Sequence, residues 1–124
     1  MDDGVRDVLN SGKRDEMEIM AAVIAITQKR SNITHILNHT SLSFPILKKY
    51  IESMIRLRLI ERSTAAKDDK GSFVYQATEK GLNFLKTYCE LLRMIYGDDF
   101  LKNKCDLVVT CLQYCKEDES NSVP

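Results

Sequence analysis

A helix start in the middle of the chain, Ser43-Phe44-Pro45, constrains the fold more than any other feature. Serine is a preferred N-cap residue, and proline is tolerated in the first helical turn because the amide hydrogen it lacks would have no partner there. Apolar side chains then recur at helical spacing: Leu47, Tyr50, Ile51, Met54 and Ile55. The side chains of the opposite face are polar: Lys48, Lys49, Glu52, Ser53 and Arg56. This pattern predicts an amphipathic helix over about 43–58 with a charged outer face.

Two helical patterns precede this start. From Lys13 to Gln28 the apolar residues follow three-and-four spacing, with Asp15 as a candidate N-cap. A shorter run follows, in which Ile33, Ile36 and Leu37 share one face. A short helix, a tight connector and a second amphipathic helix make up a helix-turn-helix.

A β-hairpin and a further helix are predicted after residue 58. The segments 59–62 and 72–76 are rich in strand-forming residues, and a polar loop ending at Gly71 separates them. Thr78 is placed to cap the helix that follows, in which Gly81 would allow a neighbouring element to approach closely. The predicted fold is therefore mostly α with a small β-hairpin: a winged helix-turn-helix followed by C-terminal helices.

The last helical segment carries an apolar stripe with the spacing of a coiled-coil seam. Its members are Leu82, Leu85, Tyr88, Cys89, Leu92 and Ile95. Such a stripe can complete the core of its own subunit or join two copies. We favour a homodimer, because the pattern continues well past the length that closes a winged helix. Gly97-Asp98-Asp99 interrupts it, and a second apolar run follows.

These patterns divide the chain into four parts. We expect a flexible N-terminus over 1–12, a winged helix-turn-helix domain over 13–81, a helical dimerisation segment over 82–116 and a disordered tail over 117–124. The net charge of zero hides a difference between them. Residues 13–88 carry +5, whereas residues 1–12 carry −2 and residues 89–124 carry −3. A basic middle is the expected charge distribution for a domain that meets DNA phosphates.

The predicted contacts with double-stranded DNA lie on the second helix of the helix-turn-helix, on its connector and on the hairpin loop. They are Ser41, Ser43, Phe44, Lys48, Lys49, Glu52, Arg56, Lys67 and Lys70. The basic side chains would neutralise phosphates, and those at the helix start would touch base edges or the nearest phosphates. Asp68 and Asp69 offset the loop lysines, so the hairpin loop is expected to be the secondary contact.

The sequence gives weaker support to metal binding, redox sensing or catalysis. Cys89, Cys105, Cys111 and Cys115 are interpreted as reduced, packed thiols of a cytoplasmic protein, with metal binding or redox sensing as the alternative. His35 and His39 have the spacing of a metal-chelating pair, but no other ligand type lies nearby in the sequence. Phosphate-binding loops, nucleophile motifs and membrane-length apolar stretches are absent from the sequence. We therefore expect no enzyme, no cofactor, no metal and no membrane association.

Several segments together resemble a known family. Leu42-Ser43-Phe44, Leu47-Lys48-Lys49-Tyr50-Ile51, Leu57-Arg58-Leu59-Ile60 and Tyr75-Gln76-Ala77-Thr78-Glu79-Lys80-Gly81 with Phe84-Leu85 are similar to an archaeal winged-helix family of small DNA-binding proteins and predicted transcriptional regulators. The resemblance covers roughly residues 13–95. It implies a dimer, because the last helix of the closest members forms an antiparallel coiled coil. The segment after Gly97 departs from the family pattern.

Three functions fit this sequence. The first is a homodimeric, sequence-specific transcriptional regulator, with the helix over 43–58 in the major groove. The second is a chromatin-type protein that binds DNA with little sequence preference. The third is a winged helix used as a protein-interaction module.

Overall fold

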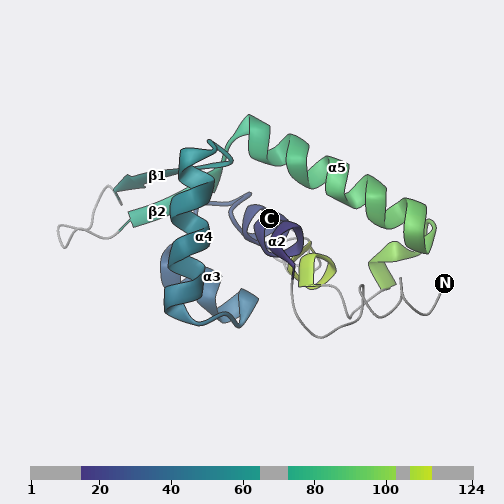
Figure 1. The fold of residues 1–124 in the computed structure, drawn as a ribbon, viewed down its shortest axis with the longest axis horizontal. Helices are drawn as coiled ribbons and strands as arrows, with labels where there is room; N and C mark the ends of the chain where they lie inside the picture. Colours follow the sequence, from purple (N-terminus) through teal and green to yellow (C-terminus); the bar gives the residue numbers. More distant parts are fainter. Residues whose placement is uncertain (1–14, 65–72, 103–106, 113–124) are drawn as a thin grey trace, which may run out of the picture.

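A computed structural model describes residues 15–64, 73–102 and 107–112. The elements, in chain order, are α2 (Glu16–Ile26), α3 (Ile33–Thr40), α4 (Phe44–Arg56), β1 (Ile60–Thr64), β2 (Phe73–Ala77), α5 (Glu79–Tyr96), the 3-10 helix η1 (Phe100–Lys102) and a helical turn over 107–112 (Figure 1). This order confirms the predicted fold class. The predicted flexible N-terminus, the predicted tail, Lys67, Lys70, Cys105 and Cys115 lie outside the described residues.

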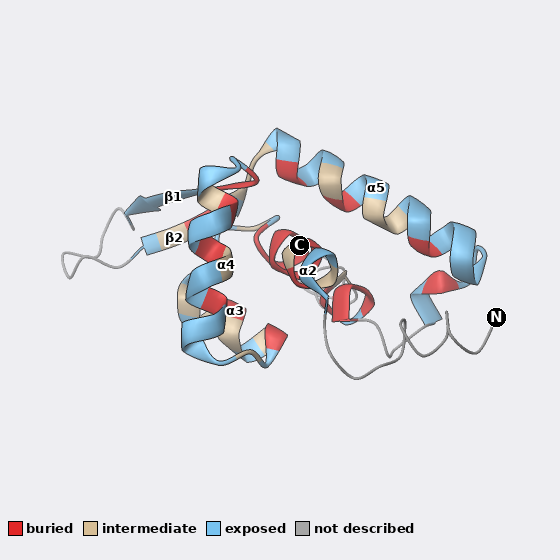
Figure 2. Ribbon diagram, in the orientation of Figure 1, coloured by how far each residue is buried: buried red, intermediate tan, exposed pale blue. Residues whose placement is uncertain are grey.

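Helix α2 is the centre of the fold. Asp15 caps it as predicted, because its Oδ1 accepts a hydrogen bond of 2.6 Å from the amide of Glu18. Every residue from Ala21 to Ile26 is buried (Figure 2), since α3, α4, α5 and β2 all pack against this helix. The small side chains among these residues allow several elements to approach on different sides. Helix α2 thus positions both the helix-turn-helix and the long helix α5.

The helix-turn-helix consists of α3, a three-residue connector and α4. Asn32 caps α3 through a 2.8 Å hydrogen bond from the amide of His35, and Ser41 ends the helix in a left-handed conformation with φ 58°. Ser43 is the N-cap residue of α4 by position, but its side chain makes no capping hydrogen bond. Pro45 lies in the first turn, as expected. The inward face of α4 is confirmed, because Leu47, Ile51 and Met54 are buried.

The two strands form an antiparallel hairpin with Ile60 opposite Ala77 and Thr64 opposite Phe73. Strand β2 is also hydrogen-bonded to the linker between α2 and α3. The amide of Ser31 donates to the carbonyl of Tyr75 at 3.0 Å, and the amide of Tyr75 donates back at 2.8 Å. This bridge was not predicted from the sequence. It fixes the hairpin beside α3 and α4, so that the hairpin forms a wing next to the helix-turn-helix (Figure 1).

A compact joint connects the end of α4 to the start of α5. The Thr78 hydroxyl accepts from the amide of Gly81 at 3.0 Å, which confirms the predicted cap. It also donates to the carbonyl of Arg58 at 2.6 Å, and the Lys80 ammonium donates to the carbonyl of Leu57 at 2.9 Å. A Cβ on Gly81 would lie 2.1 Å from the carbonyl oxygen of Leu59, which confirms the predicted close approach.

The chain turns back after α5, whose C-cap residue is Gly97 with φ 79°. Helical residues 107–112 then lie beside α2, where the amide of Leu107 donates to Glu18 Oε2 at 2.9 Å. Leu107, Val108 and Cys111 join the main core, and Val109 packs with Leu92 and Phe100 in a second cluster. Residues 107–112, which belong to the segment that departs from the family pattern, therefore complete the core of this chain. None of the described helices is both long and apolar enough to cross a bilayer.

Candidate nucleic-acid interface

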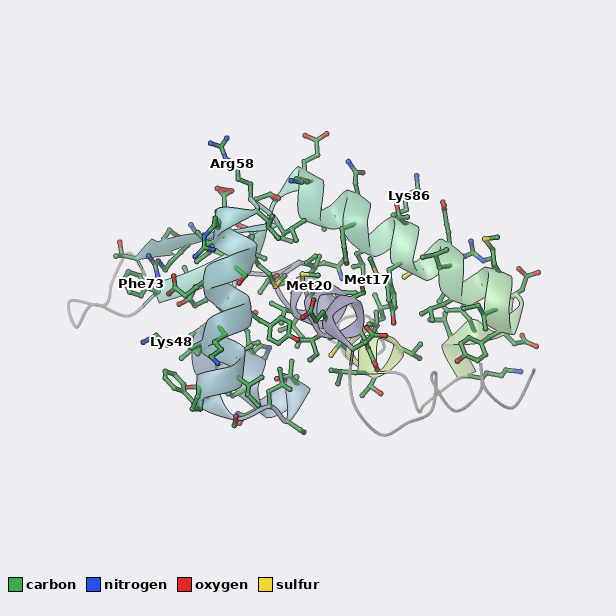
Figure 3. The ribbon with its side chains drawn as sticks, in the orientation of Figure 1. Met17, Met20, Lys48, Arg58, Phe73 and Lys86 are labelled. Carbon is green, nitrogen blue, oxygen red and sulfur yellow. The ribbon has the colours of Figure 1, made fainter. Side chains whose placement is uncertain are left out.

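The outer face of α4 brings most of the predicted DNA contacts together. Lys48, Glu52 and Arg56 follow one another at one-turn intervals, and all three are exposed. Lys49 and Ser53 are exposed beside them, and Figure 3 shows Lys48 projecting from this helix. Because the inward residues of α4 are held in the core, these side chains can meet a ligand without disturbing the packing. The face has the charge and the straight helical form that a DNA major groove accommodates.

The start of α4 adds polar and aromatic groups. Ser41 and Ser43 are exposed in the connector, and the Phe44 ring is 51% exposed at the first helical position. The first amides of a helix have no intrahelical partner and carry partial positive charge, which favours an anion at this end. Exposed serines and unpaired amides at one helix end together suit a backbone phosphate.

A groove of about 320 Å³ separates α4 from the wing. Helix α4 contributes Phe44, Lys48, Ile51 and Glu52 to its lining, and the remaining lining residues are Ile33, Arg62, Phe73 and Tyr75. Arg62 of β1 crosses the groove: its Nη1 lies 3.5 Å from Glu52 Oε1, and its guanidinium lies 4.7 Å from the centre of the Phe73 ring. Since both charged groups are half-exposed, the ion pair contributes less than about 1 kcal/mol to stability. Its importance lies in the placement of the two side chains.

Sequence reasoning missed Arg62 and Phe73 as members of this surface. The available signal was weak: Arg62 is an exposed strand residue in a hairpin expected to serve as a wing, and Phe73 begins the other strand. Arg58 was also missed. It follows the C-terminal end of α4, opposite the end that begins with Phe44, and is exposed with φ 62°. Figure 3 shows its side chain pointing outward.

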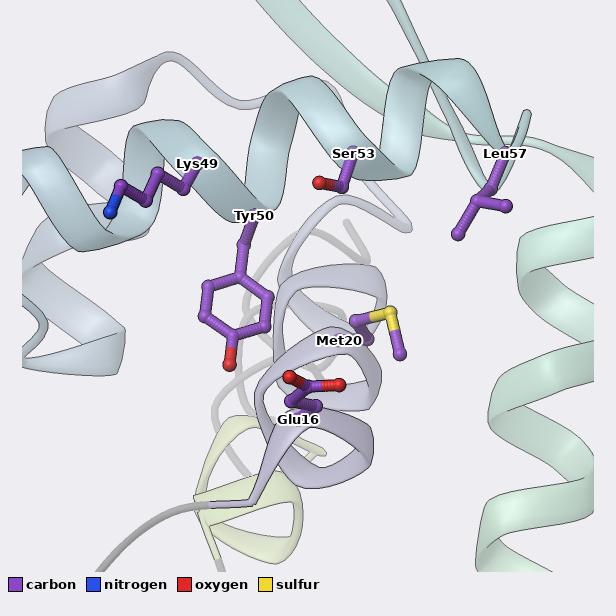
Figure 4. A pocket seen from close by; sticks show the side chains of 6 residues that line it. All are labelled: Glu16, Met20, Lys49, Tyr50, Ser53 and Leu57. Atoms are coloured by element: carbon purple, nitrogen blue, oxygen red, sulfur yellow. The ribbon is translucent and has the colours of Figure 1, made fainter.

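A second pocket of about 360 Å³ lies on the other flank of α4, between that helix and α2. Lys49, Tyr50, Ser53 and Leu57 line it from α4, and Glu16 and Met20 line it from α2 (Figure 4). Burial raises the pKa of the Tyr50 phenol, and the nearby carboxylates of Glu16 and Asp15 raise it further. Tyr50 therefore stays a neutral hydroxyl at physiological pH and packs against α2 without introducing charge.

The histidines and cysteines of the described chain show no metal centre. The rings of His35 and His39 meet edge to face at 4.6 Å between centroids, and burial and the charge of His35 lower the pKa of His39. Cys111 is buried with its Sγ 3.8 Å from the carbonyl of His39, and Cys89 is half-buried. Within the described ranges, three or more His, Cys, Asp or Glu side chains never gather in a metal-binding arrangement. This packing is typical of thiols that serve as small apolar side chains.

The residues predicted for dimerisation fall into three groups on α5. Leu85 and Leu92 are buried within the chain's own core, which is the role weighed as the alternative for this stripe. Tyr88 and Cys89 are half-buried. Leu82 and Ile95 are exposed on different sides of the helix. Helix α5 also exposes Leu91 and Met94, which sequence reasoning did not single out.

Comparison with solved structures finds proteins of similar architecture. Similar solved structures include the DNA-binding protein Sso10a-2 from Sulfolobus solfataricus (TM-score 0.59, 19% identity, 90% of this chain and 98% of that chain). Another is a MarR mutant from E. coli complexed with operator DNA (TM-score 0.55, 13% identity, 83% and 71%). A third is a MepR mutant from S. aureus bound to an oligodeoxyribonucleotide (TM-score 0.57, 13% identity, 94% and 79%).

At these identities the structural likeness shows the fold alone. A search of curated protein sequences gives no match. The sequence model of the winged helix-turn-helix family, in contrast, matches residues 13–96, which include the helix-turn-helix, the wing and α5. The chain therefore belongs to the winged helix-turn-helix family.

Proposed function

We propose that this protein is a homodimeric transcriptional regulator that binds double-stranded DNA with α4 in the major groove. The observation that carries the proposal is the outer face of α4, where Lys48, Lys49 and Arg56 are exposed on a helix whose opposite face is packed in the core. The structural relatives that were solved with operator DNA or an oligodeoxyribonucleotide share this fold. No enzymatic or cofactor role enters the proposal, and DNA as the partner agrees with the cytoplasmic location expected from the sequence.

The proposed contacts divide by chemistry. Lys48, Lys49 and Arg56 neutralise phosphates on either side of the major groove, and each such contact releases counterions. Ser41, Ser43 and Phe44 meet base edges or the nearest phosphate at the helix start. Lys67 and Lys70 of the wing loop remain secondary phosphate contacts.

Salt-dependent binding tests the DNA-binding proposal. The full chain should bind random duplex DNA with an affinity that falls steeply between about 50 and 200 mM salt. Fluorescence anisotropy with a labelled duplex measures this dependence. A preferred duplex bound at least about 1,000-fold more tightly would identify a sequence-specific regulator, and equal affinities would identify a chromatin-type protein. Absence of any salt-dependent binding would contradict the proposal and leave the protein-interaction module.

The homodimer is supported by a second apolar stripe on α5. Leu91, Met94 and Ile95 lie within about one turn of each other and are all exposed. This stripe is distinct from the buried one: Leu91 is 48% exposed and Met94 is 80% exposed. Contiguous apolar side chains on a solvent face are typical of an interface. We place the contact between two copies here, on the C-terminal half of α5.

Charge insertion in this stripe should separate the dimer. The double variant Leu91→Glu/Met94→Glu is expected to sediment as a monomer, because four buried carboxylates would face one another across the interface. Leu82→Glu is the matched control, since Leu82 is 43% exposed on the opposite flank of α5 and should leave the dimer intact. Sedimentation velocity over a range of concentrations distinguishes the two. A dimer lost only in Leu82→Glu would place the interface on the other side of the helix.

A further inference from the structure

One acidic side chain stands within the basic face of α4. Glu52 lies one turn after Lys48 and one turn before Arg56, and it is exposed. A carboxylate facing DNA phosphates lowers non-specific affinity, because like charges repel. A carboxylate at the centre of such a face is favourable where the DNA presents a hydrogen-bond donor to it, as some base edges in the major groove do.

The wing holds this carboxylate in place. Arg62 engages Glu52 Oε1 at 3.5 Å while its guanidinium packs over the Phe73 ring at 4.7 Å. The same groove is lined by Phe44 and Lys48, so the ion pair sits between the helix and the wing, not at the periphery of the surface. An ionised carboxylate accepts several hydrogen bonds through its two oxygens, so the contact of Oε1 with Arg62 leaves acceptor capacity for a ligand in this groove.

We propose that Glu52 determines specificity by accepting a hydrogen bond from the exocyclic amino group of a cytosine in the major groove, and that Arg62 is its positioning residue. The inference rests on the proposed DNA binding through α4. Cytosine and adenine both offer an amino group in this groove. The adenine amino group is flanked by the acceptors N7 of adenine and O4 of thymine, which repel a carboxylate. The cytosine amino group has an acceptor, O6 of guanine, on one side only.

Selection from a randomised duplex pool tests the assignment. The wild-type full chain should enrich sites with an invariant C·G pair at one position of each half-site. In Glu52→Gln the preference at that position should change from cytosine to adenine, because an amide pairs with both N6 and N7 of adenine. The expected change in the ratio of cytosine-site to adenine-site affinity is about ten-fold or more.

Glu61→Gln is the matched control for charge. Glu61 is an exposed neighbour of Arg62 on β1, and side chains alternate between the two faces of a strand. It should therefore keep the wild-type site. Glu52→Gln and Glu61→Gln remove the same charge, so a change of preference in both variants would reflect general electrostatics and would overturn the assignment.

The Arg62→Lys variant tests whether Arg62 acts by positioning Glu52 or only through its positive charge. Lysine keeps the positive charge but lacks the flat guanidinium that packs on Phe73, so the affinity for random duplex should stay within about two-fold while the cytosine preference falls. Lys86→Arg, on α5 and away from Glu52, should change neither quantity. If wild type binds DNA but its preferred site does not depend on Glu52, this inference fails and the proposed function stands. If wild type binds no DNA, the proposed function itself fails.

Discussion

Replacement of Gly81 by alanine is expected to lower the free energy of unfolding by about 3 kcal/mol or more, or to prevent folding. The new Cβ would lie 2.1 Å from the carbonyl oxygen of Leu59. The oxygen is a backbone atom and the Cβ is bonded directly to the backbone, so neither can rotate away. The helix and the turn would have to separate, which would break the hydrogen bonds that Thr78 and Lys80 make to the carbonyls of residues 57 and 58. A loss of this size removes a large part of the roughly 5–15 kcal/mol that stabilises a domain.

Two alanine substitutions serve as controls. Asn83→Ala, at an exposed position of the same helix, should be neutral or slightly stabilising, because alanine has the highest helix propensity. Gly97→Ala should cost only about 1 kcal/mol: Gly97 has φ 79°, but a Cβ there would meet nothing within 4 Å. Thermal and urea unfolding followed by circular dichroism measure all three. A Gly81→Ala protein as stable as Asn83→Ala would mean that α5 can move off the turn at little cost.

The helix-turn-helix could be predicted because its signals are local. Asp15 and Thr78 cap the helices that follow them, and the inward face of α4 follows from the spacing of Leu47, Ile51 and Met54. Capping and amphipathic periodicity depend on neighbours within one or two turns, which a sequence displays directly. Ser43 is the exception: it occupies the N-cap position, but its hydroxyl makes no cap.

Contacts between distant segments could not be predicted. The backbones of Ser31 and Tyr75 are hydrogen-bonded to each other. Glu18 accepts a hydrogen bond from the amide of Leu107, and Arg62 donates one to Glu52. Each depends on how the elements are placed in space, and no local pattern encodes that placement. The sequence indicated that Gly81 would meet a close neighbour but not that the neighbour would be the carbonyl of Leu59.

The stripe on α5 shows why periodicity alone leaves an interface open. Leu85 and Leu92 have the spacing of a coiled-coil seam, yet they are buried within their own subunit. Residues 107–112 return to α2 and contribute Val108 and Cys111 to the core that also contains Leu85. A seam toward a second copy and a seam toward the chain's own core have the same period. The exposure of Leu91 and Met94 is the observation that led us to propose the contact between two copies there.

The largest expected effect on binding comes from reversing two charges on α4. The double variant Lys48→Glu/Lys49→Glu should lose at least about 100-fold in affinity for duplex DNA near 100 mM salt, since two phosphate contacts become two repulsions. Both side chains are exposed, and neither makes a hydrogen bond or ion pair within the described part of the chain. The fold should therefore survive, with a thermal transition close to that of wild type.

The salt dependence distinguishes this interface from a general effect of net charge. If Lys48 and Lys49 each bind a phosphate, the slope of log affinity against log salt should become shallower by about two for each protomer on the DNA. Lys86→Glu/Lys102→Glu is the matched control. Lys86 stands on α5, where Figure 3 shows it pointing away from α4, and Lys102 lies in η1. This control changes net charge by the same amount, so its slope should stay near the wild-type value. Equal losses in both variants would mean that the protein attracts DNA through its overall charge, whereas a loss confined to the Lys48/Lys49 pair requires α4 to face the phosphates directly.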